Sequence, residues 1–106
     1  MRLRNKVALL TGAAAAFEEE LMGFGGTVAH LFAREGAKIV LTDIRDEIGE
    51  KSAIRLRAQG REAIYINLDV TSEVAWQRAV AHTLNTYGRL DILFTCPAAL
   101  TPTRAR

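Results

Sequence analysis

Short apolar runs alternate with longer mixed segments along the whole chain. Four of these runs are mostly continuous rather than alternating, and several are rich in Ile and Val; they span residues 7–10, 38–41, 63–68 and 91–94. A strand that is buried on both faces has this pattern, and parallel sheets bury both of their faces. The sequence therefore predicts four strands of a parallel sheet.

Three segments of helical length lie between the runs. The first carries Val28, Leu31 and Phe32, and the second covers about residues 46–59. The third is the clearest, because its apolar positions recur at the spacing of one helix face. The positions on that predicted face are Trp76, Val80, Thr83, Leu84 and Tyr87.

The ends of these segments carry typical helix signals. Thr71 or Ser72 can cap the start of the third helix. Gly36, Gly60 and Gly88 each follow the last helical residue of a segment and precede the next apolar run. Glycine in that place closes a helix through the left-handed conformation, so the number of elements is better defined than any single boundary.

Strict alternation of strands and helices indicates an α/β fold with right-handed crossovers. If strands two and three step outward and strand four pairs on the other side of strand one, the strand order is 3-2-1-4. We expect a partial doubly wound, or Rossmann, fold with four parallel strands and three crossover helices.

Composition narrows the function without assigning one. The 106 residues suffice for one domain, and 49% apolar with 25% charged residues is ordinary for a globular protein. A net charge of +2 is too small to indicate nucleic acid or an anionic membrane as a partner. A single cysteine, Cys96, excludes an internal disulfide and a structural zinc, and no stretch approaches a signal peptide or a membrane span. The expected location is the cytoplasm.

The clearest candidate chemistry lies after the first two strands. Strand one runs into Thr11 and Gly12, and Gly23, Phe24 and Gly25 open the first helix. A glycine-rich turn of this kind lets backbone N–H groups approach a pyrophosphate at a helix N-terminus.

An acidic residue, Asp43, ends the second strand. A carboxylate in that place can accept hydrogen bonds from the adenosine ribose hydroxyls. The same charge would repel a 2′-phosphate, so the sequence favours NAD over NADP.

The third strand also ends in an acidic residue. Asp69, followed by Val70, lies where a carboxylate could reach an adenine amino group. Alternatively, Asp69 and Thr71 merely begin the next helix. Position alone leaves both interpretations open.

These motifs together resemble the N-terminal part of the short-chain dehydrogenase/reductase family, from Lys6 to Phe94. The resemblance rests on KVALLTG (6–12), GFGG (23–26), HLFAREGA (30–37), LTD (41–43), LDVT (68–71) and GRLDIL (88–93). It implies that Gly12, Gly23 and Gly25 form the pyrophosphate turn. It also implies that Asp43 binds the ribose and that Asp69 with Val70 binds the adenine. Members of this family transfer a hydride between NAD(P) and an alcohol or carbonyl group.

Three departures from the family pattern change the expected activity. The family has Thr-Gly-x-x-x-Gly-x-Gly, whereas ten residues separate Gly12 from Gly23 here, and the extra residues fall within 15–22. This insertion carries Glu18, Glu19 and Glu20, which would repel a pyrophosphate unless the segment loops into solvent.

The second departure follows the fourth strand, where the family's Asn-Asn-Ala-Gly is replaced by Thr-Cys-Pro-Ala at residues 95–98. The third concerns the catalytic Tyr-x-x-x-Lys pair. Tyr65 and Tyr87 are the two tyrosines, and neither has a lysine four residues later. We therefore expect residues 1–94 to form a truncated NAD(P)-binding domain and residues 95–106 a divergent tail.

Several functions fit this sequence. An oxidoreductase fragment that is inactive alone is the leading hypothesis. The chain could instead be an enzyme component completed by a separate chain, or a non-enzymatic nucleotide-binding or interaction module. An adenosylmethionine-binding fold fits less well. In each case the fourth strand would form an uncovered apolar edge, which favours self-association or a partner chain.

Overall fold

The computed structural model describes residues 2–12 and 24–95. Within these residues strands and helices alternate strictly, as the sequence predicts, and the predicted strand boundaries differ from the observed ones by no more than two residues. The elements are β1 (Val7–Thr11), α1 (Phe24–Arg34), β2 (Lys38–Asp43), α2 (Asp46–Ala58), β3 (Ala63–Asn67), α3 (Glu73–Tyr87) and β4 (Ile92–Phe94).

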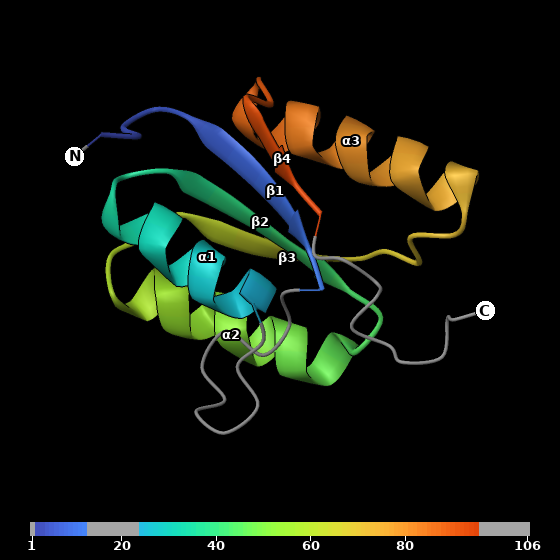
Figure 1. The fold of residues 1–106 in the computed structure, drawn as a ribbon, viewed down its shortest axis with the longest axis horizontal. Coiled ribbons are helices and arrows are strands. Elements are labelled where there is room, and N and C mark those ends of the chain that lie inside the picture. Colours follow the sequence, from blue (N-terminus) through green and yellow to red (C-terminus); the bar gives the residue numbers. More distant parts are fainter. Residues whose placement is uncertain (1, 13–23, 96–106) are drawn as a thin grey trace.

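The strands form one parallel sheet in the order β3-β2-β1-β4 (Figure 1). Leu9 of β1 pairs with Val40 of β2 on one side and with Leu93 of β4 on the other. All five residues of β1 are buried, whereas β3 and β4, which have one neighbour each, are only partly buried. The expected partial Rossmann fold is confirmed.

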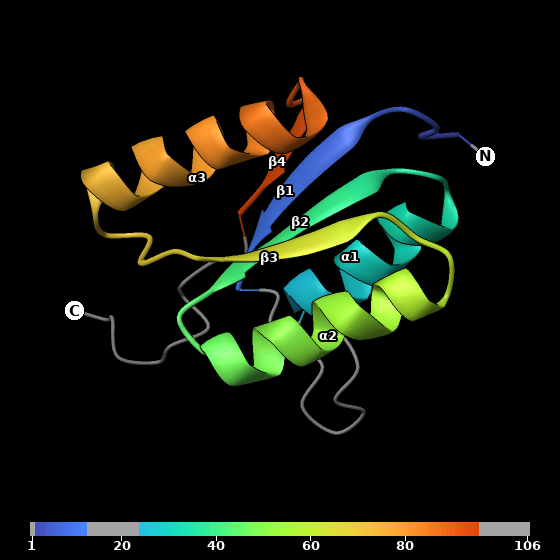
Figure 2. The ribbon, with the colours of Figure 1, turned by 180° about the vertical axis from the view of Figure 1, so that it is seen from behind.

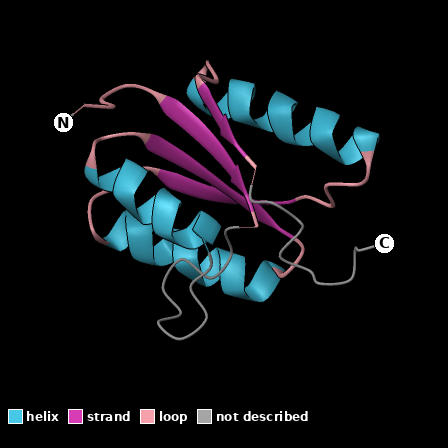
Figure 3. Cartoon of the chain, in the orientation of Figure 1, coloured by secondary structure: helices cyan, strands magenta, loops and turns pink. Residues whose placement is uncertain are grey.

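Helices cover both faces of this sheet. Figures 1 and 2 show α1 and α2 on one face and α3 on the other, and Figure 3 shows the same three layers by element type. Because side chains alternate along a strand, β1 contributes to both cores. Ala8 and Leu10 pack toward α1 and α2, and Val7 and Leu9 pack toward α3.

Local signals in the sequence explain where the helices begin and end. Ser72 is the N-cap of α3, because its Oγ accepts a hydrogen bond from the Ala75 backbone N–H at 3.1 Å. The three glycines that follow the helices have positive φ angles of 96°, 84° and 82° at Gly36, Gly60 and Gly88. Only glycine adopts this conformation at little cost, which confirms the predicted ends.

The buried face of α3 differs from the predicted one at Ala79 and Leu84. Thr83 is fully buried, together with Ala79, and its hydroxyl donates to the Ala79 carbonyl at 2.8 Å. Leu84, which was expected on the same face, is 45% exposed. It lies on the flank of the helix rather than at its centre, because successive residues turn by about 100°. Leu93 of β4 is also exposed, at 55%.

No helix in the described part of the chain is long and apolar enough to cross a membrane.

Candidate functional site

The polar residues singled out from the sequence gather at one edge of the sheet, where the strands end. Parallel strands all present their carboxyl ends at the same edge, and the register aligns Thr11 with Thr42 and Asp43 with Asn67. In open α/β sheets this edge is where ligands bind, beside the point where the strand order reverses. Here the reversal lies between β1 and β4.

The turn after β1 has the backbone shape that glycine permits. Gly12 adopts φ of 66°, and the side chain before it, Thr11, is buried. The backbone of Phe24 and Gly25 forms the first turn of α1, whose N–H groups have no partner within the helix. Gly23 and the insertion at 15–22 lie outside the described residues.

Asp43 is held firmly at the end of β2. Its side chain is only 7% exposed, and Oδ1 accepts hydrogen bonds from the backbone N–H groups of Ile44 at 2.7 Å and Arg45 at 3.2 Å. The Arg45 guanidinium adds two further bonds, Nε to Oδ1 at 3.2 Å and Nη2 to Oδ2 at 3.1 Å. The carboxylate is thus fixed in orientation by four donors, two of them from a side chain.

A hydrogen-bonded cluster that the sequence analysis missed supports the Asp43 backbone. The Tyr65 hydroxyl lies 2.7 Å from the Asp43 carbonyl and 2.7 Å from Oδ1 of Asp46, and Asn67 donates to the same Oδ1 at 2.8 Å. The Leu68 N–H also donates to the Asp43 carbonyl, at 2.9 Å. The cluster joins the end of β2, the start of α2 and the end of β3. Its sequence signal was the pair of polar side chains at i and i+2 on the third strand.

The pKa values of Asp46 and Tyr65 in this cluster are shifted in opposite directions. Hydrogen bonds from Asn67 and Tyr65 lower the pKa of Asp46 below its ordinary value. Burial, together with the neighbouring Asp46 carboxylate, raises the pKa of Tyr65. At neutral pH the cluster therefore combines a protonated phenol with an ionised carboxylate.

Asp69 lies in the loop after β3 and stabilises that loop. Its Oδ1 accepts bonds from the Thr71 N–H at 2.9 Å and the Thr71 hydroxyl at 2.6 Å, which lower the pKa of the Asp69 carboxyl. This geometry supports the alternative in which Asp69 and Thr71 lead into α3. The carboxylate nevertheless remains at the exposed carboxyl edge, and the next residue, Val70, is 46% exposed.

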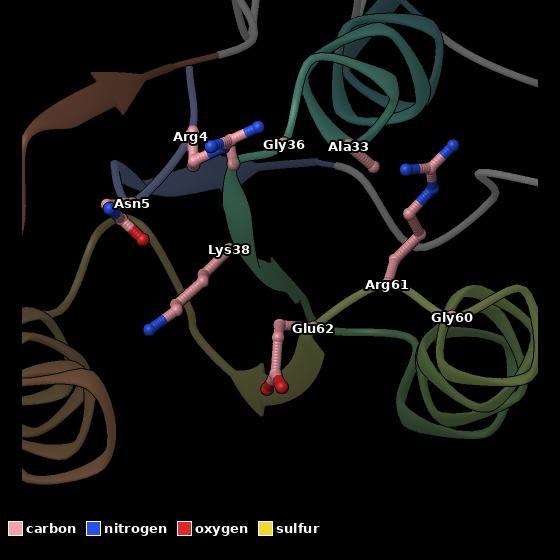
Figure 4. A pocket seen from close by; sticks show the side chains of 9 residues that line it. Arg4, Asn5, Ala33, Gly36, Lys38, Gly60, Arg61 and Glu62 are labelled. Atoms are coloured by element: carbon pink, nitrogen blue, oxygen red, sulfur yellow. The ribbon is translucent and has the colours of Figure 1, made fainter. Parts of the chain in front are cut away.

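The opposite edge of the sheet has a pocket of about 180 Å³ with different chemistry. Figure 4 shows that Arg61 extends away from Lys38 and Glu62, so their charged groups do not converge. The lining also includes Gly36 and Gly60, which follow α1 and α2. Helix C-termini carry partial negative charge, so basic residues are favourable there without any ligand.

Asp91 is a structural residue at that same edge. Its Oδ2 accepts a bond from the Val7 N–H at 2.9 Å, and Arg89 binds both carboxylate oxygens at 2.8 Å. These bonds hold the pKa of Asp91 below its ordinary value. They join the start of β4 to the start of β1.

Within residues 2–12 and 24–95 no group of three His, Cys, Asp or Glu side chains lies as a metal site requires. Cys96 and the Pro97 that follows it lie outside the described residues.

The fold and its carboxyl edge define a doubly wound α/β protein of the Rossmann class. The family model of short chain dehydrogenases matches residues 6–105. The chain therefore belongs to the short-chain dehydrogenase family, as the motifs indicated.

Similar proteins cover nearly the whole chain but are much longer. Secoisolariciresinol dehydrogenase of Forsythia intermedia is 39% identical over 105 residues, which are 99% of this chain and 35% of that protein. Cyclopentanol dehydrogenase of a Comamonas strain is 40% identical over 100 residues, or 94% of this chain and 37% of the relative. This chain thus spans about a third of the length of these relatives.

A solved structure of the family likewise matches most of this chain and is much longer than it. A short chain dehydrogenase/reductase from Burkholderia phymatum, determined in complex with NAD, superposes with a TM-score of 0.77 at 30% identity. The match covers 88% of this chain and 31% of that one.

Proposed function

We propose that this chain binds the adenosine and pyrophosphate part of a nicotinamide dinucleotide at the carboxyl edge of its sheet, with NAD preferred over NADP. The observation that carries the proposal is the Asp43 carboxylate, which is fixed at the end of β2 beside the glycine turn of β1. A fixed carboxylate can accept hydrogen bonds from two vicinal ribose hydroxyls without losing side-chain entropy on binding.

The pyrophosphate would lie between the glycine turn and α1. Gly12 already has the left-handed φ of a tight turn, and the first backbone N–H groups of α1, from Phe24 and Gly25, follow at the same edge. Partial positive charge at a helix N-terminus attracts phosphate. The related enzyme from Burkholderia phymatum, with the same fold, was crystallised with NAD.

The adenine would lie beyond the ribose, near the loop after β3. Val70 offers an exposed apolar side chain there, and Asp69 offers a carboxylate next to it. An adenine amino group is a donor, so a carboxylate is a suitable partner for it.

We further propose that these 106 residues bind the cofactor without transferring hydride by themselves. The family's proton donor is a tyrosine with a lysine four residues later, and neither tyrosine here has one. Their surroundings also disfavour the role. Tyr65 is bound to Asp46, and burial raises the pKa of Tyr87 to about 12, far from the value that suits proton transfer at neutral pH.

Calorimetric titration of NAD into the chain tests the binding proposal. The informative variant is Asp43→Asn, which keeps an acceptor for the Ile44 N–H but removes the charge. We expect NAD to bind the variant about tenfold more weakly, since hydrogen bonds to a charged group contribute about 1.5–3 kcal/mol. Glu50→Gln is the matched control, because it removes one negative charge from an exposed position of α2.

Equal affinity of both variants for NAD, or no binding by the parent chain, would refute the ribose assignment. Measurable reduction of NAD by the chain with simple secondary alcohols would refute the second proposal alone.

A second function is favoured by the exposed apolar residues beside β4. Leu93 is 55% exposed on β4, and Leu84 is 45% exposed on α3, on the same face of the sheet. In the described residues β4 is an edge strand with unpaired backbone groups. We propose that another polypeptide, either a second copy or a separate completing chain, pairs with this edge.

Sedimentation of the purified chain tests self-association through β4. We expect a concentration-dependent dimer that Leu93→Lys abolishes, because a charge on the edge would be buried by pairing. Val74→Lys is the matched control, since Val74 is 57% exposed in the first turn of α3, at the other end of the helix from Leu84. A parent chain that is monomeric at all concentrations would contradict self-association and leave a separate partner as the occupant to be sought.

A further inference from the structure

The Tyr65 side chain reaches from β3, past the start of α2, to the end of β2. Its ring lies beside Gly49, where an added Cβ would be only 2.7 Å from Cζ of the ring. Its hydroxyl lies 2.7 Å from the Asp43 carbonyl oxygen and 2.7 Å from Oδ1 of Asp46. Because residue 49 has no side chain, the ring fits there, and its hydroxyl lies next to the peptide group that follows Asp43.

The Asp43 carbonyl belongs to the same peptide group as the Ile44 N–H. In a planar trans peptide these two groups point in opposite directions. The carbonyl faces β3, where the Tyr65 hydroxyl and, at 2.9 Å, the Leu68 N–H donate to it. The Ile44 N–H donates to Oδ1 of the Asp43 carboxylate at 2.7 Å. A donor that holds the carbonyl therefore also aims this N–H at the carboxylate.

The orientation of the Asp43 carboxylate depends strongly on this one peptide group. At 2.7 Å the bond from the Ile44 N–H is shorter than the three bonds from Arg45, which measure 3.1 to 3.2 Å. Two of those three come from the Arg45 guanidinium, and the Arg45 side chain is 48% exposed. Ion pairs of exposed side chains are weak because water competes for them. The peptide between Asp43 and Ile44 is thus the firmer support.

The Tyr65 hydroxyl has one proton for two acceptors. Burial raises the pKa of Tyr65, so the hydroxyl stays protonated at neutral pH. The Asp46 carboxylate competes with the Asp43 carbonyl for this proton, and Asn67 supplies the same carboxylate with a further donor at 2.8 Å. Removing the charge of Asp46 should direct the hydroxyl more firmly at the carbonyl, since a neutral acceptor competes less well than an ionised one.

We propose that Tyr65 is a positioning residue for ribose recognition, because its hydroxyl holds the peptide group that orients the Asp43 carboxylate. The inference rests on the proposed binding of the ribose at Asp43, and it adds a side chain from β3 to that site. Tyr65 acts through the peptide and not on the ligand. Its effect should appear as discrimination between ribose and deoxyribose, since a misplaced acceptor affects only the hydroxyl that uses it.

The experiment measures the affinities of ADP and 2′-deoxy-ADP by calorimetry in the parent chain and in Tyr65→Phe. Both nucleotides carry the adenine and the pyrophosphate, and the deoxy analogue lacks one of the two ribose hydroxyls. We expect the parent to prefer ADP by about tenfold, as a hydrogen bond to a charged acceptor implies. In Tyr65→Phe the preference should fall to about threefold. A merely structural role would weaken both nucleotides equally and leave their ratio unchanged.

Two further variants test the shared proton and the substitution itself. Asp46→Asn removes the competing charge and should keep the ratio at the parent value or raise it by up to about twofold. The change in charge affects both nucleotides alike, so it cancels in the ratio. Tyr87→Phe is the matched control, because Tyr87 ends α3 on the other face of the sheet, and it should leave the ratio unchanged. Thermal melting of each variant confirms that it is folded.

An unchanged ratio in Tyr65→Phe, or a fall in Asp46→Asn as large as in Tyr65→Phe, would overturn the inference while ribose binding stands. A lower ratio in Tyr65→Phe together with a preserved ratio in Asp46→Asn would support it. If Tyr65→Phe does not fold, Asp46→Asn decides alone, because a lower ratio overturns the inference and a higher one supports it. A parent chain that binds neither nucleotide, or binds both equally, would refute the ribose assignment at Asp43 and this inference with it.

Discussion

The substitution Gly49→Ala tests whether the hydrogen-bonded cluster around Tyr65 determines how α2 packs on the sheet. Gly49 is buried in the first turn of α2, and a Cβ added there would lie 2.7 Å from Cζ of Tyr65 and closer still to two other ring carbons. The ring cannot move aside freely, because its hydroxyl is held by the Asp43 carbonyl and the Asp46 carboxylate. Gly49→Ala should therefore destabilise the fold, although alanine is the better helix former.

The two opposing effects can be compared in magnitude. Replacing glycine by alanine inside a helix stabilises it by about 1 kcal/mol. Overpacking of this kind costs about 1–3 kcal/mol, and each displaced tyrosine hydrogen bond costs about 1 kcal/mol more. We expect a net loss of about 1–3 kcal/mol, or at least about 4–8 °C in melting temperature for a chain of this size.

Thermal and urea unfolding, followed by circular dichroism, measure this loss. The decisive comparison is the double variant Gly49→Ala with Tyr65→Leu, in which the smaller side chain leaves room for the methyl group. In the Tyr65→Leu background, Gly49→Ala should become neutral or stabilising.

Gly60→Ala is a contrasting control. Gly60 has φ of 84° and open space around its Cβ position. That substitution should cost about 1–2 kcal/mol in either background, because its strain is local. A Gly49→Ala variant as stable as the parent, or a loss that Tyr65→Leu does not relieve, would refute the close-packing argument.

Three further outcomes follow from the structure. Ser72→Ala should destabilise the chain by about 1 kcal/mol in urea unfolding, because the Ala75 N–H loses its acceptor; Ser72→Asp should restore it. Asp91 has a lowered pKa in the folded state, so its contribution to stability is present above the unfolded value of 3.8 and disappears as the pH falls through the folded value. Melting curves from pH 6 to pH 2 should show a smaller acid-induced loss for Asp91→Asn than for the parent, and equal losses would contradict this. Tyr87 has a pKa raised to about 12, so stability should fall between pH 10 and pH 12 as the unfolded state loses the proton first. Ultraviolet titration of a Tyr87→Phe variant should lack this late phenol ionisation.

Much of the fold could be read from the sequence because its signals are local or periodic. Continuous apolar runs identified strands buried on both faces, and glycines marked the helix ends. The parallel order 3-2-1-4 was expected on the condition that strand four pairs on the other side of strand one, and the structure confirms that order. The positions of Gly12, Asp43 and Asp69 at one edge followed in turn, because parallel strands end on the same side.

Other features depended on contacts between residues far apart in the chain. The sequence analysis placed Leu84 in the core of α3, but which flank of a helix is covered depends on the neighbouring strand and not on spacing alone. The roles of Tyr65 and Gly49 were equally hidden, because a ring on β3 and a missing side chain on α2 meet only when helix and sheet pack.

The sequence by itself determined the class of this protein: a parallel α/β sheet of the short-chain dehydrogenase family with an acidic residue at the end of the second strand. The tertiary structure decided which side chain that acidic residue pairs with. Arg45 is a charged neighbour two positions along the chain, and only the turn into α2 folds its guanidinium back onto the Asp43 carboxylate. Side-chain electrostatics depend on distances of a few ångströms, and those distances are set by the packing of α2 and β3 around the end of β2.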